Sequence, residues 1–176
     1  DSLQALLEHV HQLHHFGIML EDQPLWEPAL AALRQVEDGR RVWVHGDLHL
    51  RNFFLLPDRS VLSMDTALDR LDSPYLDLGK LLADLQTRRA YLFSRGVFPP
   101  RAMIDRLSRA FLDGYFAGEQ PQPLLLAVYE GRFLIQKWVE SLETLQQTFT
   151  GRRVPLGIAA QHLIINPAFQ RIVTAW

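Results

Sequence analysis

Residues 44–52 have the sequence VHGDLHLRN, and residues 63–65 have the sequence SMD. Apolar runs flank both stretches, with VWV before the first and FFLL and VL between the two. Because β-branched and aromatic residues favour strands, the pattern predicts a strand, a loop and then a small hairpin. The hairpin would bring Asp65 back to the loop that carries Asp47 and Asn52.

The polar residues of this unit suit phosphoryl transfer to a hydroxyl group, which needs alignment and neutralisation of charge more than covalent help. Asp47 can orient an acceptor hydroxyl and take its proton. Asn52 and Asp65 offer the oxygen ligands that Mg²⁺ prefers. His45 can bond nearby backbone and fix the loop. Each residue alone would be an ordinary turn residue between strands. Together they predict a kinase-type site.

Amphipathic periodicity predicts that most of the remaining chain is helical. The class we expect is mainly α with a few short β-strands (α+β). We expect residues 53–56 to form a buried strand and residues 66–72 a charged connection. The expected helices cover 2–16, about 28–36, a stretch that begins at Ser73 and Pro74, 101–116, 123–148, and one or two short segments after a loop at 151–155. In the helix over 101–116 the expected apolar stripe is Met103, Leu107, Phe111 and Tyr115.

Composition limits the classes of partner and of chemistry that we expect for the chain. A formal net charge of −2 gives no global field that would attract nucleic acid, and the 48% of hydrophobic residues can form a substantial core. The chain has no Cys, which excludes disulfides and thiolate chemistry. It has no apolar run long enough for a membrane span and no signal peptide, so we expect a cytoplasmic protein. His11 and His15 are spaced for a metal site, but without a matching acidic residue we favour a polar helix face.

The motif at the loop resembles that of a known superfamily. His45-Gly46-Asp47, then Asn52, then Asp65 is similar to the Brenner motif of the aminoglycoside phosphotransferase and choline kinase superfamily, which has a protein-kinase-like fold. Further matches follow it in the sequence. DTA at 65–67, DSP at 72–74 and DLG at 77–79 stand where the family commonly has Asp-Trp-Glu, Gly-Asp-Pro and Asp-Leu-Ala, and FLDGY at 111–115 resembles its FL-x-GY helix.

This resemblance implies that residues 1–176 are the helical C-terminal lobe of such a kinase, with a catalytic segment over 42–79. Asp47 would be the catalytic base, and Asn52 and Asp65 the magnesium ligands. Asp77 would brace the catalytic loop from the start of its helix. The implied enzyme is an ATP-dependent small-molecule kinase that uses Mg²⁺ and transfers the γ-phosphate of ATP to a hydroxyl. The sequence departs from the family at Thr66 and Ala67, and again at 72–73.

The acceptor is not specified by these motifs. Candidate substrate-binding residues are His49, Asp69 and Asp72. Acidic residues near the site would suit a cationic acceptor such as an aminoglycoside, but we favour a solvated charged surface because Arg residues are interspersed among them. For His49, contact with substrate and an exposed loop position stand equally open.

A complete kinase of this type also needs a β-rich N-terminal lobe that clamps ATP with a Gly-rich loop and a Lys. Lys80 and Lys137 are the only lysines, and both follow Asp65 on predicted helices, where neither can be the clamp lysine. We therefore expect an N-terminal lobe of the same protein to be missing here, and the fragment to be inactive alone. The alternatives are a catalytically idle kinase-like binding or regulatory module, or a lipopolysaccharide core sugar kinase.

Overall fold

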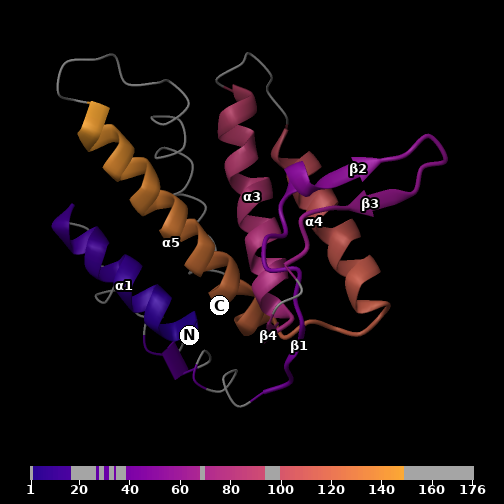
Figure 1. Cartoon of the computed structure of the whole chain (residues 1–176), viewed down its shortest axis with the longest axis horizontal. Coiled ribbons are helices and arrows are strands. Elements are labelled where there is room, and N and C mark those ends of the chain that lie inside the picture. The colour runs from indigo at the N-terminus through magenta and orange to yellow at the C-terminus, as the bar shows by residue number, and fades with distance from the viewer. Residues whose placement is uncertain are drawn as a thin grey trace.

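The structure, a computed structural model, describes residues 2–16, 39–67, 70–93 and 100–148, together with residues 27, 30, 31 and 34. Over these residues the chain is mainly α with short antiparallel strands, which confirms the predicted α+β class. Most of the helix expected at 28–36 lies outside the described residues. So do all the elements expected after residue 148. The described helices are α1 (Ser2–His15), α3 (Tyr75–Phe93), α4 (Arg101–Phe116) and α5 (Pro123–Thr148) (Figure 1).

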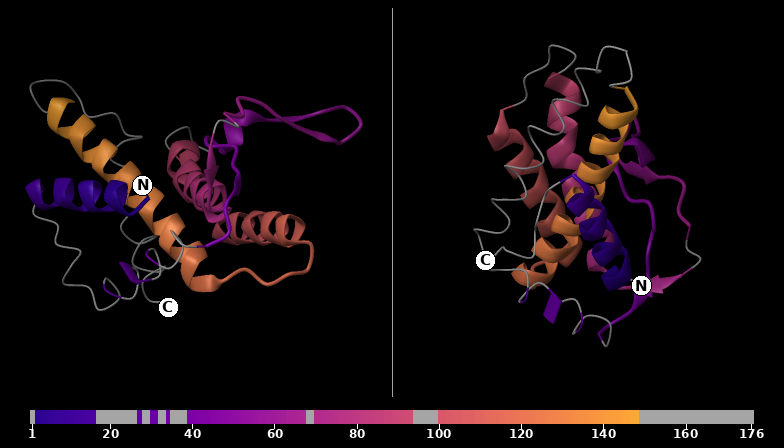
Figure 2. Two further views of the ribbon diagram at one scale, coloured as in Figure 1. Left: turned by 60° about the horizontal axis from the view of Figure 1, so that its bottom comes forward. Right: turned by 90° about the vertical axis from the view of Figure 1, so that its left-hand side faces the viewer.

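Helix α3 is the centre of the fold. It packs against α5 on one side and α4 on the other, while α1 packs against α5 (Figures 1 and 2). Four of its leucines are buried, namely Leu78, Leu81, Leu82 and Leu85. A helix buried on several sides carries leucine around most of its circumference. Polar residues of α3 that reach the loop, Asp77, Lys80 and Asp84, lie among these leucines.

The crossing of α3 and α5 depends on Gly79. A Cβ at this position would lie 2.5 Å from the backbone carbonyl carbon of Tyr129 and 2.7 Å from the backbone nitrogen of Glu130. Real Cβ atoms do not approach backbone this closely, so only glycine lets the two helices meet at this distance. This contact fixes the position of α3, and with it the surface on which the loop rests.

The strands form two antiparallel pairs. β2 (Phe53–Leu55) pairs with β3 (Val61–Ser63), which confirms the predicted hairpin. β1 (Val42–Trp43) pairs with β4 (Leu71–Asp72), with Val42 opposite Asp72. The charged connection expected over 66–72 thus ends in a strand that the sequence did not predict. This pairing places the segment before the loop beside the start of α3.

The prediction that residues 53–56 are buried is wrong. Leu55 is 75% exposed, and Val61 opposite it is 63% exposed. The hairpin projects away from the helices, and of the β2 residues Phe53 is the one that packs against the buried core (Figures 1 and 2). An apolar run predicts a strand equally well whether or not another element covers it.

The apolar stripe expected on α4 is wrong at three of its four positions. Met103, Leu107 and Tyr115 are exposed, whereas Phe111 packs, partly buried, against a cluster that contains the buried Ile104 and the partly buried Leu112. Positions spaced by four residues drift around a helix of 3.6 residues per turn, so a stripe drawn only at that spacing leaves the contact face. Within the described part of the chain, none of the helices has the length and apolarity needed to cross a membrane.

Candidate active site

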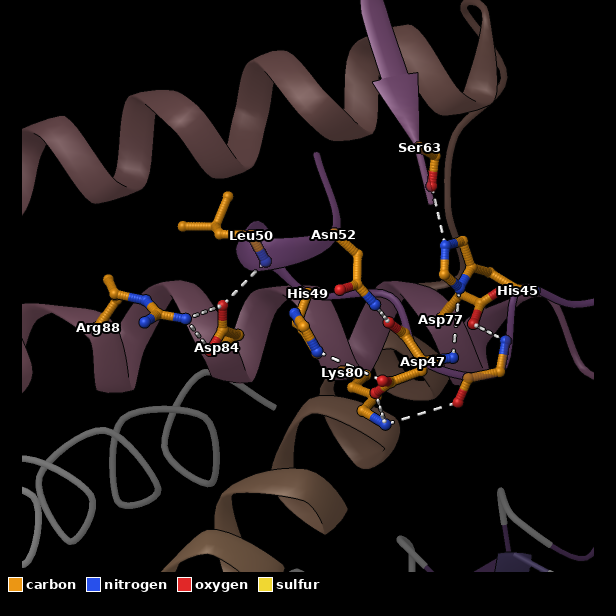
Figure 3. Close-up of polar contacts among 11 residues, drawn as sticks. His45, Asp47, His49, Leu50, Asn52, Ser63, Asp77, Lys80, Asp84 and Arg88 are labelled. Atoms are coloured by element: carbon orange, nitrogen blue, oxygen red, sulfur yellow. Dashed lines mark hydrogen bonds and ion pairs between the residues drawn. The ribbon is translucent and has the colours of Figure 1, made fainter. Parts of the chain in front are cut away.

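Asp77 holds the start of the loop over residues 45–52, which carries Asp47 and Asn52. Its carboxylate accepts hydrogen bonds from the backbone N–H groups of His45, with N···Oδ2 at 2.6 Å, and Gly46, with N···Oδ1 at 2.9 Å (Figure 3). Asp77 is buried in the first turn of α3, where the helix dipole favours a negative charge. Gly46 has φ +80°, a left-handed backbone that glycine adopts without strain. The contact is the one that the resemblance implies for a bracing residue.

We predict that Asp77→Ala lowers the free energy of unfolding by about 2–4 kcal/mol, because two backbone N–H groups lose a buried charged acceptor. Urea denaturation followed by circular dichroism measures the change. Asp113→Ala on the exposed face of α4 is the control, with an expected change within about 0.5 kcal/mol. Equal stability of the two variants would show that Asp77 does not hold the loop.

Asp84 holds the other end of the loop from the same helix. The backbone N–H of Leu50 donates to Asp84 Oδ2 at 3.0 Å, and Arg88 Nη2 lies 3.0 Å from both carboxylate oxygens (Figure 3). Leu50 begins the short 3₁₀ helix η1 (Leu50–Asn52). Asp77 and Asp84 are seven residues apart, about two helical turns, and so share one face of α3. The loop is therefore tied to α3 at both ends.

His45 links the loop to the hairpin. The backbone N–H of Asp47 donates to His45 Nδ1 at 3.3 Å, so in the neutral ring the proton is on Nε2. Nε2 lies 2.8 Å from Ser63 Oγ at the end of β3 and is the donor in that hydrogen bond (Figure 3). His45 is buried and touches the loop and the hairpin rather than open solvent. This is the loop-fixing geometry that the sequence suggests for it.

Asp47 presents its carboxylate at the surface of the loop, with its side chain 48% exposed. Lys80 Nζ lies 2.6 Å from Oδ1, and His49 Nε2 lies 3.3 Å from Oδ2 (Figure 3). The hydrogen bond from Lys80, together with the charges of Lys80 and His49, lowers the pKa of Asp47 below its usual value. Asp47 is therefore ionised near neutral pH, as an acceptor for a hydroxyl proton must be.

We predict that Lys80→Met raises the pKa of Asp47 back toward that of a free Asp. The folded pKa of Asp47 lies below the unfolded value, so its ionisation favours folding above the unfolded pKa, and this contribution is lost as the pH falls through the folded pKa. A carboxyl-carbon NMR titration of Asp47 in wild type and variant measures the difference. Lys137→Met is the control, and an Asp47 pKa unchanged by Lys80→Met would contradict the prediction.

Asn52 and Asp65 are placed on adjacent segments. Asn52 Nδ2 donates to the backbone oxygen of Asp47 at 3.0 Å. This hydrogen bond fixes the orientation of the side-chain amide and leaves its Oδ1 atom available to bind a cation. The backbone N–H of Met64 donates to the oxygen of Asn52, and that of Ala67 donates to the oxygen of His45. The segment that carries Asp65 thus runs along both ends of the loop.

Asp65 itself has φ +55°, which is costly for a residue other than glycine and is typical of functional sites. With Asn52 Oδ1 it supplies a neutral and a charged oxygen, a donor set that fits a hard divalent cation whose other ligands are phosphate and water. Among the described residues no group of three or more His, Cys, Asp or Glu is arranged to hold a metal. A cation bound by Asn52 and Asp65, with phosphate and water as its other ligands, would take only Asp65 from these four residue types.

The candidate substrate-binding residues separate in the structure. His49 is 15% exposed in its side chain and contacts Asp47, so it is not an exposed loop residue. Asp72 accepts a hydrogen bond from the backbone N–H of Ser73 at 2.8 Å and lies 3.8 Å from Arg70, which engages its carboxylate locally. Asp69 lies outside the described residues. Of the three, His49 is the residue that the fold brings to Asp47.

Lys80 and Asp84 are the site residues that sequence analysis missed. Both share the face of α3 that starts with Asp77, at spacings of three and seven residues. That polar row within a leucine-rich helix was the available signal, because it marks a face that meets polar groups rather than core.

A pocket of about 450 Å³ also lies between the start of α3 and the end of α4, lined by Tyr75, Phe116 and Glu119 among others. None of its lining residues belongs to the loop.

No protein-family model matches the chain, and no curated protein matches it significantly. The function proposed below therefore depends on the motif and on the geometry of the site.

Proposed function

We propose that this chain is the acceptor-side lobe of an ATP-dependent phosphotransferase that transfers the γ-phosphate of ATP to a hydroxyl of a small molecule. One observation carries the proposal. The exposed carboxylate of Asp47 stands on a loop that α3 holds at both ends, with Asn52 bonded to the same loop and Asp65 on the adjacent segment. The resemblance to the aminoglycoside phosphotransferase and choline kinase superfamily supports the same reaction.

The chemistry follows from these positions. Asp47 accepts a hydrogen bond from the acceptor hydroxyl and aims its oxygen at the γ-phosphorus, then takes the proton as the new P–O bond forms and the bond to ADP breaks. Asn52 and Asp65 would hold Mg²⁺, which neutralises the phosphate charge when bound. His45 and Asp77 keep Asp47 in place, because both fix the backbone on which it stands.

A metal test addresses this proposal. We expect the full-length protein to transfer phosphate from ATP only with Mg²⁺, and Asp65→Asn to raise the Mg²⁺ concentration required by at least about tenfold, because a charged oxygen ligand becomes neutral. Initial rates across a magnesium titration measure it. Asp58→Asn at the tip of the hairpin is the control, since its carboxylate accepts from Ser60 away from the loop. The same magnesium dependence in both variants would count against Asp65 as a ligand.

The proposal includes a β-rich N-terminal lobe of the same protein that supplies the ATP clamp. The exposed apolar side chains of the β2–β3 hairpin support it, since exposed apolar surface commonly marks an interface: Phe54 pairs with Leu62 across the hairpin, and both are exposed. A cytoplasmic location, where ATP is available, is part of the same proposal.

We therefore predict that residues 1–176 alone bind Mg·ATP weakly and transfer little phosphate. The physical reason is that the loop supplies the base and the metal ligands but no group for the α- and β-phosphates. Isothermal titration and a transfer assay on this fragment, beside the full-length protein, make the comparison. Robust transfer by the 176 residues alone would refute the need for a second lobe.

A further inference from the structure

The contact between Lys80 and Asp47 lowers the pKa of the candidate base, but it also occupies one of the two oxygens that the acceptor hydroxyl would need. Lys80 Nζ lies 2.6 Å from Asp47 Oδ1 and 3.5 Å from the backbone oxygen of Gly46 (Figure 3). The Lys80 side chain is 27% exposed, and Nζ lies 5.8 Å from the centroid of the Phe133 ring. The ammonium group of Lys80 thus lies beside the candidate base and over the face of an aromatic ring.

We propose that Lys80 is a catalytic residue that moves from Asp47 to the transferred phosphoryl group when nucleotide is bound, and so frees Asp47 Oδ1 for the acceptor hydroxyl. The inference rests on the proposed function and deepens it. It assigns to α3 a cation for the phosphoryl oxygens that is separate from any lysine of an ATP clamp.

The reach of the side chain supports this role. An acceptor oxygen bonded to Asp47 would lie about 3 Å from its carboxylate, and the γ-phosphorus about 3–3.5 Å beyond that oxygen. Lys80 already touches Asp47 on a flexible four-carbon stem, so a change of rotamer brings Nζ to the phosphoryl oxygens.

Of Lys80 and His49, the two described residues that form ion pairs with the Asp47 carboxylate, Lys80 is the one able to change partners. His49 is only 15% exposed in its side chain, and its Nδ1 is buried with no hydrogen-bond partner among the described residues, which places its ring in a packed position. Lys80, in contrast, ends in an ammonium group that can rotate about several bonds. The acceptor hydroxyl therefore takes the Oδ1 side of Asp47.

The transfer step is balanced without a further reactant. The acceptor oxygen forms a bond to the γ-phosphorus, and the bond from that phosphorus to the bridging oxygen breaks with its electron pair leaving on ADP. The hydroxyl proton passes to Asp47. Lys80 keeps its protons and neutralises charge on the non-bridging phosphoryl oxygens, where fixed donors have their largest effect.

The test compares Lys80→Met and Lys80→Arg with Lys137→Met, a control at the other lysine, on α5, in the full-length protein. We measure kcat for transfer and the Kd values of Mg·ATP and Mg·ADP. Lys80→Met is expected to lower kcat by about 10²-fold or more and to reduce the preference for ATP over ADP by about tenfold. Lys80→Arg should retain part of both, and Lys137→Met should match wild type.

The ratio of the two Kd values separates the possible roles of Lys80. A lower kcat with an unchanged ATP preference would show that Lys80 only orients Asp47, which overturns the inference, as would an unchanged kcat. If Lys80→Met fails to fold, Lys80→Gln replaces it, because it keeps much of the stem and a polar end. A wild-type protein that binds ATP but transfers no phosphate would contradict the proposed function instead, while the Kd ratio would still test Lys80.

Discussion

Asp47→Asn in the full-length protein is expected to lower kcat for phosphoryl transfer by about 10²–10⁴-fold, the usual contribution of a positioned general base. The amide can still fill the space, but it cannot accept the hydroxyl proton. Its amide oxygen can still accept a hydrogen bond from the ammonium of Lys80, which lies 2.6 Å from the carboxylate in the native chain. The KM for ATP should change much less, because the proposed mechanism places Asp47 at the acceptor rather than at the nucleotide.

The same variant separates the enzyme from a catalytically idle module. Asp58→Asn provides the matched control, since both residues are aspartates outside the helices with solvent-accessible side chains, and Asp58 lies at the tip of the hairpin, away from the site. Circular dichroism should show both variants folded, because the Asp47 side chain is half-exposed and its loss removes no core contact. An Asp47→Asn protein with wild-type kcat would mean that this loop performs no chemistry.

Gly79→Ala is expected to destabilise the fold by about 3 kcal/mol or more. The added methyl group would lie 2.5 Å from the backbone of Tyr129, and backbone cannot move aside as a flexible side chain can. Helix α3 and α5 would have to separate, which would also displace the surface that carries Asp77, Lys80 and Asp84. Urea denaturation measures the loss of stability.

Gly114→Ala is the control for this substitution. Gly114 lies within α4, and a Cβ there would meet nothing within 4 Å. Replacing glycine by alanine in a helix interior reduces the conformational entropy of the unfolded chain, so a gain of about 0.5–1 kcal/mol is expected. If Gly79→Ala were instead neutral, the α3–α5 crossing would not be as close as the structure places it.

Local sequence patterns predicted the elements that depend on local periodicity. The bounds of α4 and α5 follow from proline at or before their first residues and from apolar spacing along them, and the β2–β3 hairpin follows from two apolar runs around a turn. The polar pattern of Asp47, Asn52 and Asp65 marked the candidate site for the same reason, since spacing along the chain is what a motif records.

The remainder depends on contacts between distant segments. Apolar residues at 53–56 are compatible with a buried strand and with an exposed one. Leu55 is exposed because the hairpin extends away from the helices. β4 has two residues, which are too few to show the alternation of apolar and polar residues that predicts a strand. Lys80 follows Asp77 by three residues, but its meeting with Asp47 requires the position of α3 that Gly79 sets. The polar row on α3 marks the face that carries Lys80, but no pattern within a single element identifies Asp47 as its partner or predicts the exposure of Leu55 and the pairing of β4.

The central claim, that Asp47 serves transfer from ATP to a small-molecule hydroxyl, is tested most directly by ³¹P NMR of the full-length protein with ATP, Mg²⁺ and a panel of hydroxyl-bearing small molecules. We predict a new phosphate-ester signal that grows with ADP at equal rates for one class of acceptor, and that is lost in Asp47→Asn. ATP that is stable with every acceptor, or the same ester formation in the Asp47→Asn protein, would contradict the claim.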